Sequence, residues 1–329
     1  MSEPSNPHTA QRPTISGWHE AVLSVRDLEA AIDLYELIAG YEVIERSDLP
    51  DALLRAYRLP DSAWGYQALM RSPGAETGFL RIMQFEGVPQ RRIRSHGRPW
   101  EPGGLFDVNA QVASMEETFK GFDEAGWHAF SDPVSFDFGP FTVKEWITTG
   151  PHGESHGFIE REAPTPEGWP ALNRTSRLFN STQIVADLDT SLDFYRRVLG
   201  FETCLEHHGP SAEAGPNVLG LPHTVATSER RHVYILHPQG GTDGSVELLG
   251  FDTFDGRHFG QHAAPPNLGL LALRFPVSNA GALAEHLLIE DIPFTVSPVQ
   301  IDLSPYGRTT LFAVQAPEGA WLEFFETVR

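Results

Sequence analysis

The sequence predicts an α+β fold in which four βαβββ modules pair into two cupped mixed sheets. Two internal repeats predict it. Residues 24–42 return at 184–202 at one constant offset, and residues 131–141 resemble 297–306. A repeat of this length sets the architecture of a chain. A lone module of this kind leaves one apolar sheet face uncovered, so modules are expected to pair and to enclose a cupped cleft.

The first repeat is expected to form a strand, a helix and a second strand. Residues 21–25 are short and apolar, which indicates a strand. Asp27 stands where a helix N-cap is expected, and Gly40 is expected to end the helix. Residues 41–44 then alternate like a strand that enters a sheet.

The second repeat is expected to complete each module with a helix and paired strands. Helices are predicted at 115–125 and 279–290. Strands are predicted at 143–148, 157–160, 309–314 and 321–325. The four modules are placed at 17–87, 104–161, 177–252 and 266–327. They give a flexible tail at 1–16, an N-terminal domain at 17–161, a linker at 162–176 and a C-terminal domain at 177–329.

Composition narrows the class of partner. The chain has 329 residues, enough for about two domains, and its net charge of -20 argues against nucleic acid and anionic membranes as partners. The single cysteine, Cys204, excludes an internal disulfide and favours the cytoplasm. No apolar run approaches the length of a membrane span. A small-molecule substrate is the expected partner, and a homodimer stays open.

Short motifs in both repeats carry a resemblance to a known family. They are Val25-Arg-Asp-Leu and Val185-Ala-Asp-Leu, Ala39-Gly-Tyr and Leu199-Gly-Phe, and Ala316-Pro-Glu-Gly-Ala-Trp-Leu-Glu. On these motifs the chain resembles the vicinal oxygen chelate superfamily, which includes glyoxalase I, extradiol dioxygenases and bleomycin-resistance proteins. The resemblance implies a divalent metal held by a histidine on the first strand and a glutamate on the last strand of paired modules. That metal would act as a Lewis acid on substrate oxygens.

The resemblance identifies eight half-site positions in this chain. The first-strand positions are Glu20, Asp107, Asn180 and Leu270, none of them a histidine. The last-strand positions are Arg81, Gly157 with His156 beside it, Glu247 and Glu323. Two of the eight positions therefore keep the glutamate of the family. One divalent metal (Fe, Mn, Zn or Mg), or none, is the expected cofactor.

Module pairing decides which of these residues meet. Pairing of neighbours gives one cleft with Glu20, Arg81 and Asp107, and a second with Asn180, Glu247 and Glu323. Crosswise pairing gives one cleft with Glu20, Arg81 and Glu323. The second cleft then holds Asp107, Asn180, Glu247 and His156, the best metal set in the chain. The joints are of similar length and favour neither arrangement. We favour neighbour pairing, because the ring-cleavage dioxygenases resemble this chain in module number.

The expected function is that of a small-molecule lyase or isomerase acting on an oxygenated apolar or aromatic compound by carboxylate acid–base catalysis, with or without a metal. The alternatives are an extradiol ring-cleavage dioxygenase and a metal-free binding or resistance protein. The predicted catalytic residues are Glu247 and Glu323. The predicted substrate-binding residues are Asn180, Tyr306, Arg308 and Arg81, and the predicted metal ligands are Glu247, Glu323, Asp107 and His156.

Overall fold

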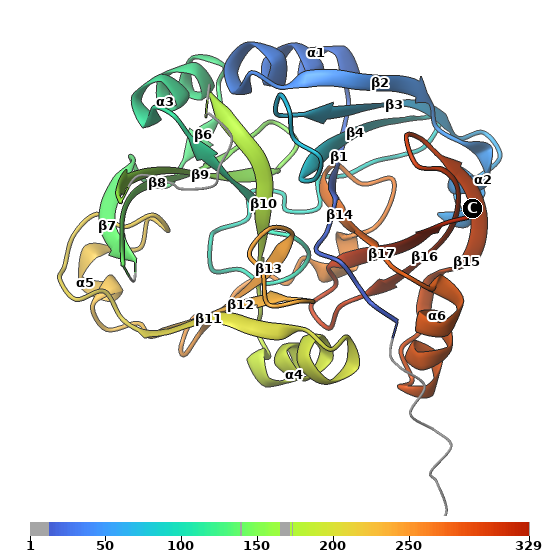
Figure 1. Cartoon of the computed structure of the whole chain (residues 1–329). Helices are drawn as coiled ribbons and strands as arrows, with labels where there is room; N and C mark the ends of the chain where they lie inside the picture. The colour runs from blue at the N-terminus through green and yellow to red at the C-terminus, as the bar shows by residue number, and fades with distance from the viewer. Residues whose placement is uncertain (1–12, 139, 165–171, 173, 329) are drawn as a thin grey trace, which may run out of the picture.

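Two curled sheets and short helices make up the chain (Figure 1). The structure is a computed structural model that describes residues 13–138, 140–164, 172 and 174–328. In Figure 1 the blue and red strands form one sheet, and the green and yellow strands form the other. The predicted α+β fold with two mixed sheets is confirmed.

The first sheet has eight strands and combines the first and fourth modules. In spatial order they are β15 (Phe294–Leu303), β16 (Gly307–Gln315), β17 (Trp321–Thr327), β14 (Gly269–Pro276), β1 (Glu20–Val25), β4 (Phe79–Glu86), β3 (Trp64–Arg71) and β2 (Glu42–Asp48). The central strands β1 and β14 are antiparallel, and Glu20 lies opposite Arg274.

The second sheet has nine strands and combines the second and third modules. In spatial order they are β11 (Glu202–Gly209), β12 (Arg231–His237), β13 (Ser245–Phe251), β10 (Thr175–Ile184), β5 (Asp107–Val112), β9 (Ser155–Ala163), β8 (Phe141–Thr149) and β6 (His128–Ala129), with β7 (Val134–Phe138) paired to β8. The central strands β10 and β5 are again antiparallel.

The favoured neighbour pairing of modules is therefore wrong, and the crosswise alternative is the one observed. Each sheet takes one module from each half of the chain. The predicted domains 17–161 and 177–329 therefore do not correspond to the two sheets. The joints that cross between the sheets are held side by side. Arg257 forms an ion pair with Glu101, and Arg92 bridges to Leu268.

Helices cover the outer faces of both sheets. They are α1 (Leu28–Leu34) with η1 (Tyr35–Ala39), α3 (Met115–Glu124), α4 (Leu188–Asp193) with η2 (Phe194–Val198), and α6 (Ala280–Ile289). The short helices α2 (Asp51–Ala56), α5 (His223–Ala226) and η3 (Gly260–His262) lie in connections. The predicted ends of the first helix are observed: the Asp27 carboxylate accepts a hydrogen bond from the Ala30 amide, and Gly40 has a positive φ of 72°.

The largest apolar cluster lies between the sheets and takes residues from both. Helices meet across this boundary, since α3 contacts η1 and the imidazole of His286 in α6 donates a hydrogen bond to the carbonyl of Val198. The two sheets thus meet through their outer, helix-covered faces. Their inner faces, on the concave side of each curled sheet, point away from each other. Each has its own, smaller apolar cluster.

Two predicted boundaries are corrected. The tail predicted at 1–16 is too long, because Ile15 forms a bridge with Val277; residues 1–12 lie outside the described part. The linker predicted at 162–176 is too wide, because β9 continues to Ala163 and β10 begins at Thr175. None of the helices described is long and apolar enough to cross a membrane.

Candidate active site

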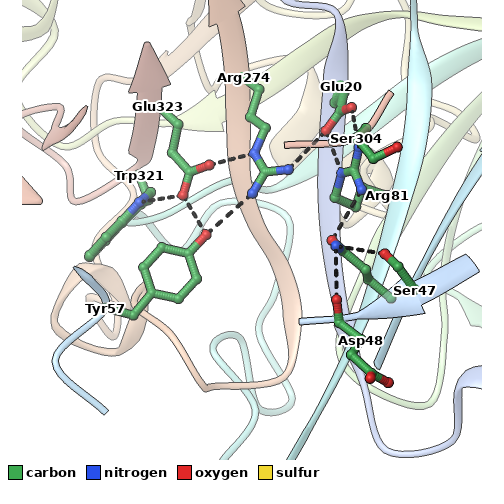
Figure 2. Close-up of polar contacts among 10 residues, drawn as sticks. Glu20, Ser47, Asp48, Tyr57, Arg81, Arg274, Ser304, Trp321 and Glu323 are labelled. Atoms are coloured by element: carbon green, nitrogen blue, oxygen red, sulfur yellow. Dashed lines mark hydrogen bonds and ion pairs between the residues drawn. The ribbon is translucent and has the colours of Figure 1, made fainter. Parts of the chain in front are cut away.

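The inner face of the first sheet holds a buried ion network, which comprises Glu20, Arg81, Arg274 and Glu323 (Figure 2). Arg81 contacts both carboxylate oxygens of Glu20 at 2.7 Å. Arg274 bridges the two acids, with 3.0 Å to Glu20 and 2.5 Å to Glu323. All four side chains are 0% exposed. Two cations and two anions thus compensate one another where a metal would sit.

Neighbouring groups satisfy the remaining polar atoms of the network. Tyr57 donates a hydrogen bond of 2.6 Å to Glu323, and Arg81 donates to Gln67 at 3.0 Å. Burial by itself would raise the pKa of Glu20, but the Arg81 and Arg274 guanidiniums outweigh burial and lower that pKa to about 2. The Glu20 carboxylate is therefore ionised at every physiological pH.

The space beside this network is filled by the protein itself. Leu53 of α2, Tyr57 and Trp321 belong to one apolar cluster on the inner face. Tyr306 packs against Phe325 with 4.6 Å between ring centroids, and burial raises the pKa of its hydroxyl. The described residues leave Glu323 and Arg81 in a packed interior, where a substrate would first have to displace side chains.

Two residues of this sheet differ from the expectation. The fourth first-strand position was expected at Leu270, but its side chain belongs to the central cluster between the sheets. Arg274 lies opposite Glu20 instead, and the pairing passes over Leu271 of β14 between Val22 and Leu23, which puts Leu270 and Arg274 on opposite faces. A lone arginine inside the apolar run 270–275 was the signal that sequence reasoning missed. The predicted substrate ligand Arg308 is exposed and donates to Gln300.

The inner face of the second sheet holds a different set of acids. Thr182 of β10 lies opposite Asp107 of β5 on one side and Glu247 of β13 on the other. The three residues therefore form one row across the three central strands. Asp107 is 2% exposed, and burial raises its pKa to about 6, against hydrogen bonds from Thr182 and Asn109 and the charge of Arg94.

The next row on the same face of the sheet carries amide side chains. Asn109 donates a hydrogen bond of 2.8 Å to the Asn180 side-chain oxygen, and the Asn180 amide donates to Ser245 at 2.8 Å. The Asn180 carboxamide is thus bonded at both ends within the sheet. Gly157 gives Asn109 its room, because a Cβ at Gly157 would lie only 1.9 Å from the Asn109 oxygen. Glycine is required there by close approach.

A third acid, Glu145 of β8, joins this face and was missed from sequence. Val143, Glu145 and Ile147 share one side of the strand, because Trp146 between them belongs to the central cluster. An acid that interrupts an apolar stripe was the available signal. Glu145 and Glu247 are half-buried. Burial first, and then the nearby Asp107 charge, raises the pKa of each to about 8.

His156 does not join Asp107 and Glu247, although the sequence placed it with them. Successive residues of a strand face opposite sides, and His156 points to the central cluster. It lies 2.8 Å from the Tyr35 hydroxyl and stacks on Phe158. Burial lowers its pKa to about 3, so the imidazole is neutral.

Comparisons with known proteins now identify the fold. Residues 177–324 match the family model described as Glyoxalase/Bleomycin resistance protein/Dioxygenase superfamily. This segment belongs to the vicinal oxygen chelate superfamily. No curated protein sequence matches the chain significantly.

Solved structures of this superfamily resemble the whole chain. Glyoxalase I from Zea mays is 14% identical, with a TM-score of 0.61, and the match covers 96% of this chain and 93% of that one. A protein of Bacillus subtilis subsp. subtilis strain 168, provisionally named a dioxygenase, is 13% identical, with a TM-score of 0.58 and coverage of 96% and 86%. At these identities the likeness establishes the fold alone.

Metal binding typical of the vicinal oxygen chelate fold does not fit the residues present. Among the described residues, no three acidic, histidine or cysteine side chains converge closely enough to hold a metal ion. In the first sheet Arg81 stands at a family position, and Arg81 and Arg274 occupy the oxygens of Glu20 and Glu323; an arginine cannot coordinate a metal. The second sheet offers oxygen donors from Asp107, Glu247 and Thr182, but the predicted ligand His156 faces the central cluster and does not join them.

The raised pKa values predict a stability that falls with pH. Glu145 and Glu247 hold protons in the fold up to about pH 8, whereas the ordinary glutamate pKa is 4.5. The folded state then binds more protons than the unfolded state between those values, so the free energy of unfolding decreases as pH rises from about 5 to about 8. Denaturant unfolding at a series of pH values should show this slope.

A variant isolates the two groups responsible for that slope. In Glu145→Gln/Glu247→Gln the slope between pH 6 and 8 should largely vanish, because the amides do not titrate. Glu20, with its pKa of about 2, stabilises the fold above pH 4.5 and loses this contribution only as pH falls through about 2, outside the window. An unchanged slope in the double variant would contradict the assignment.

Proposed function

We propose that the inner face of the second sheet is the active site of an enzyme that moves a proton beside a carbonyl group of a small molecule, as a lyase or an isomerase. The observation that carries the proposal is the pair of half-buried glutamates, Glu145 and Glu247, each with a pKa near 8 beside the buried Asp107. Catalytic acids and bases work best with pKa values near the operating pH. Clusters of perturbed carboxyl groups are typical of active sites.

The two glutamates take different roles. A side-chain hydrogen bond from Thr182 lowers the pKa of Glu247, and the charge of Glu145 raises it, so that both glutamates titrate near pH 8. We assign the role of base to Glu247, because Thr182 holds its carboxylate in the row across the central strands, and Glu145 is the group that keeps its proton. Asp107 is buried beneath them, and its charge holds both pKa values high. Two coupled carboxyl groups share one proton near their common pKa, so an acid and a base are both present at that pH.

The proposed reaction begins with removal of a proton from carbon. The Glu247 carboxylate takes the proton from the carbon next to the carbonyl, and the electron pair of that C–H bond forms the enolate. The protonated Glu145 donates a hydrogen bond to the enolate oxygen, which stabilises the developing charge. Return of the proton to another carbon completes an isomerisation. Departure of a group from the β-carbon, protonated by Glu145, completes a lyase reaction.

Of the alternatives, the dioxygenase has the least support in the residues. Iron sites of that type need histidine ligands. Asn180 stands at the expected histidine position of the second sheet, and its carboxamide is already bonded to Asn109 and Ser245. A binding protein without turnover is distinguished from the enzyme by experiment.

Proton exchange in D2O tests the proposal without a known product. Carbonyl compounds with aromatic or apolar bodies are incubated with the protein near pH 8, and loss of the α-proton signal is followed by NMR. Wild type should exchange at least one of them, and the Glu145→Gln/Glu247→Gln variant should not. The assay is repeated with EDTA and with added Mn²⁺, and the rate should be the same in both.

Three results would contradict the proposal. Exchange that persists in the double variant would place the chemistry elsewhere. Compounds that bind tightly and never exchange would favour the binding protein. Exchange that depends on Mn²⁺ would return a divalent metal to the site.

A further inference from the structure

Arg161 of β9 is a cation on the inner face of the second sheet for which the described residues provide no ion pair. Its side chain shares the face of Gly157, two positions beyond Ile159, and it lies opposite Val143 of β8. The guanidinium carbon is 4.1 Å from the centroid of the Phe141 ring, so the aromatic ring holds it in place. Its Nε atom is buried and has no hydrogen-bond partner.

A buried N–H donor without a partner needs a reason. Leaving such a group unpaired is unfavourable, and more so when it carries charge. The other arginines on an inner face, Arg81 and Arg274, are fully paired. Arg161 therefore differs from them in carrying a charge that no acid among the described residues pairs with.

The surface beside Arg161 is apolar and is not part of the core. Val134, Phe136 and Phe138 of β7 are half-buried, while Ser135 and Asp137 between them are exposed. The register places Phe136 opposite Val143, on the side of the sheet that carries Glu145. None of these three apolar side chains belongs to the apolar clusters of the described residues. They form a half-buried apolar strip outside the apolar clusters of the described residues.

We propose that Arg161 binds the carboxylate of the substrate, and that the substrate is a small aromatic or apolar acid whose hydrocarbon lies against β7 and β8. This proposal rests on the proposed function. Guanidinium and carboxylate match as a pair of parallel hydrogen bonds, which a lysine or an amide cannot reproduce. Phe136 and Phe141 then contact the substrate body.

The spacing between the anchor and the acids agrees with such a substrate. Val143, opposite Arg161, and Glu145 are two residues apart on β8, which corresponds to about 7 Å along a strand. A carboxylate held at Arg161 would thus leave a carbon several bonds away within reach of Glu145. Glu145 and Glu247 repel an anionic ligand once they ionise, so Arg161 favours an anion only while these glutamates hold protons. Binding of the carboxylate is therefore expected to weaken above pH 8.

Binding of two matched probes tests the inference. The probes are 3-phenylpropanoate and its neutral amide, 3-phenylpropanamide, which differ only in the group that would meet Arg161. Titration calorimetry or NMR at pH 7 should show that wild type binds the acid at least tenfold more tightly. Arg161→Gln should remove this preference and leave amide binding unchanged, and Arg161→Lys should keep a part of it.

Arg196 of η2 provides a matched control beside strands of the same sheet. It also stacks on an aromatic ring, Tyr234 at 5.1 Å, but it is exposed and bonded to Thr203. Arg196→Gln should retain the wild-type preference for the acid. A wild-type protein without preference, or an Arg161→Gln variant that keeps it, would overturn the inference.

The two proposals fail in different ways. If the acid probe binds through Arg161 but no compound exchanges protons in D2O, the anion site stands and the proposed reaction falls. If exchange by wild type is unaffected in KM and kcat by Arg161→Gln, the proposed reaction stands and the anion site falls. If Arg161→Gln raises KM for acids and leaves kcat near wild type, both stand.

Discussion

Replacing Arg274 by methionine should lower the free energy of unfolding by about 3–5 kcal/mol. Arg274 is 0% exposed and joins the Glu20 and Glu323 carboxylates in the buried ion network. Methionine matches much of its length but has no charge, so one negative charge in the interior loses its partner. An uncompensated buried charge is far more costly than the absence of the whole pair. Thermal and denaturant unfolding midpoints measure the loss.

The pH dependence of this variant separates charge from packing. Without Arg274, burial dominates and the pKa of an acid in the network should rise, so lower pH should restore part of the lost stability. A packing defect would give the same loss at pH 5 and at pH 8. Arg274→Lys keeps the charge, so its free energy of unfolding should lie between those of wild type and Arg274→Met. This variant tests the prediction even if Arg274→Met does not fold.

Arg308→Met is the matched control for the stability prediction. Arg308 lies in the same module and is exposed, and its side chain hydrogen-bonds to the side chain of Gln300. Its replacement should change stability by less than about 0.5 kcal/mol. If Arg274→Met were as mild as this control, the ion network would not be the element that holds the inner face of the first sheet.

Replacing Glu247 by glutamine should lower kcat by about 10²–10⁴-fold in the exchange reaction, with little change in KM. The glutamine keeps the shape of the side chain but cannot accept the proton. Glu323→Gln should act differently, because Glu323 lies in the packed first sheet and its replacement weakens an ion pair with Arg274. It should lower stability and leave kcat of the folded fraction near wild type.

The pH profile of the wild-type rate should be bell-shaped with a maximum near pH 8. Glu247 must be ionised and Glu145 protonated, and both have pKa values of about 8. Two coupled carboxyl groups titrate as a pair, so the profile reports values of the pair. Glu206→Gln is the control, because this acid lies on the outer face of β11 and bonds to His208. A rate that stays constant from pH 6 to pH 9 would exclude the glutamates.

Local elements of this protein were determined by its sequence alone. Asp27 as a helix cap and Gly40 as a helix end depend on backbone chemistry within a few residues, and both are observed. The repeats indicated the modules, and the motifs indicated the superfamily. The position of Glu247 on an inner sheet face also followed from a motif. Its catalytic role stays a prediction.

Module pairing was decided only by the tertiary structure. The joints have similar lengths, and the entropy of closing a loop changes only slowly with its length, so connectivity favoured neither arrangement. Pairing of neighbours would have brought the Glu20 and Asp107 carboxylates into one cleft. Crosswise pairing gives Glu20 a cation, Arg274, from the far end of the chain, and leaves Asp107 with two glutamates. The same long-range choice packed one inner face with ion pairs and left the other with acids that titrate near neutral pH.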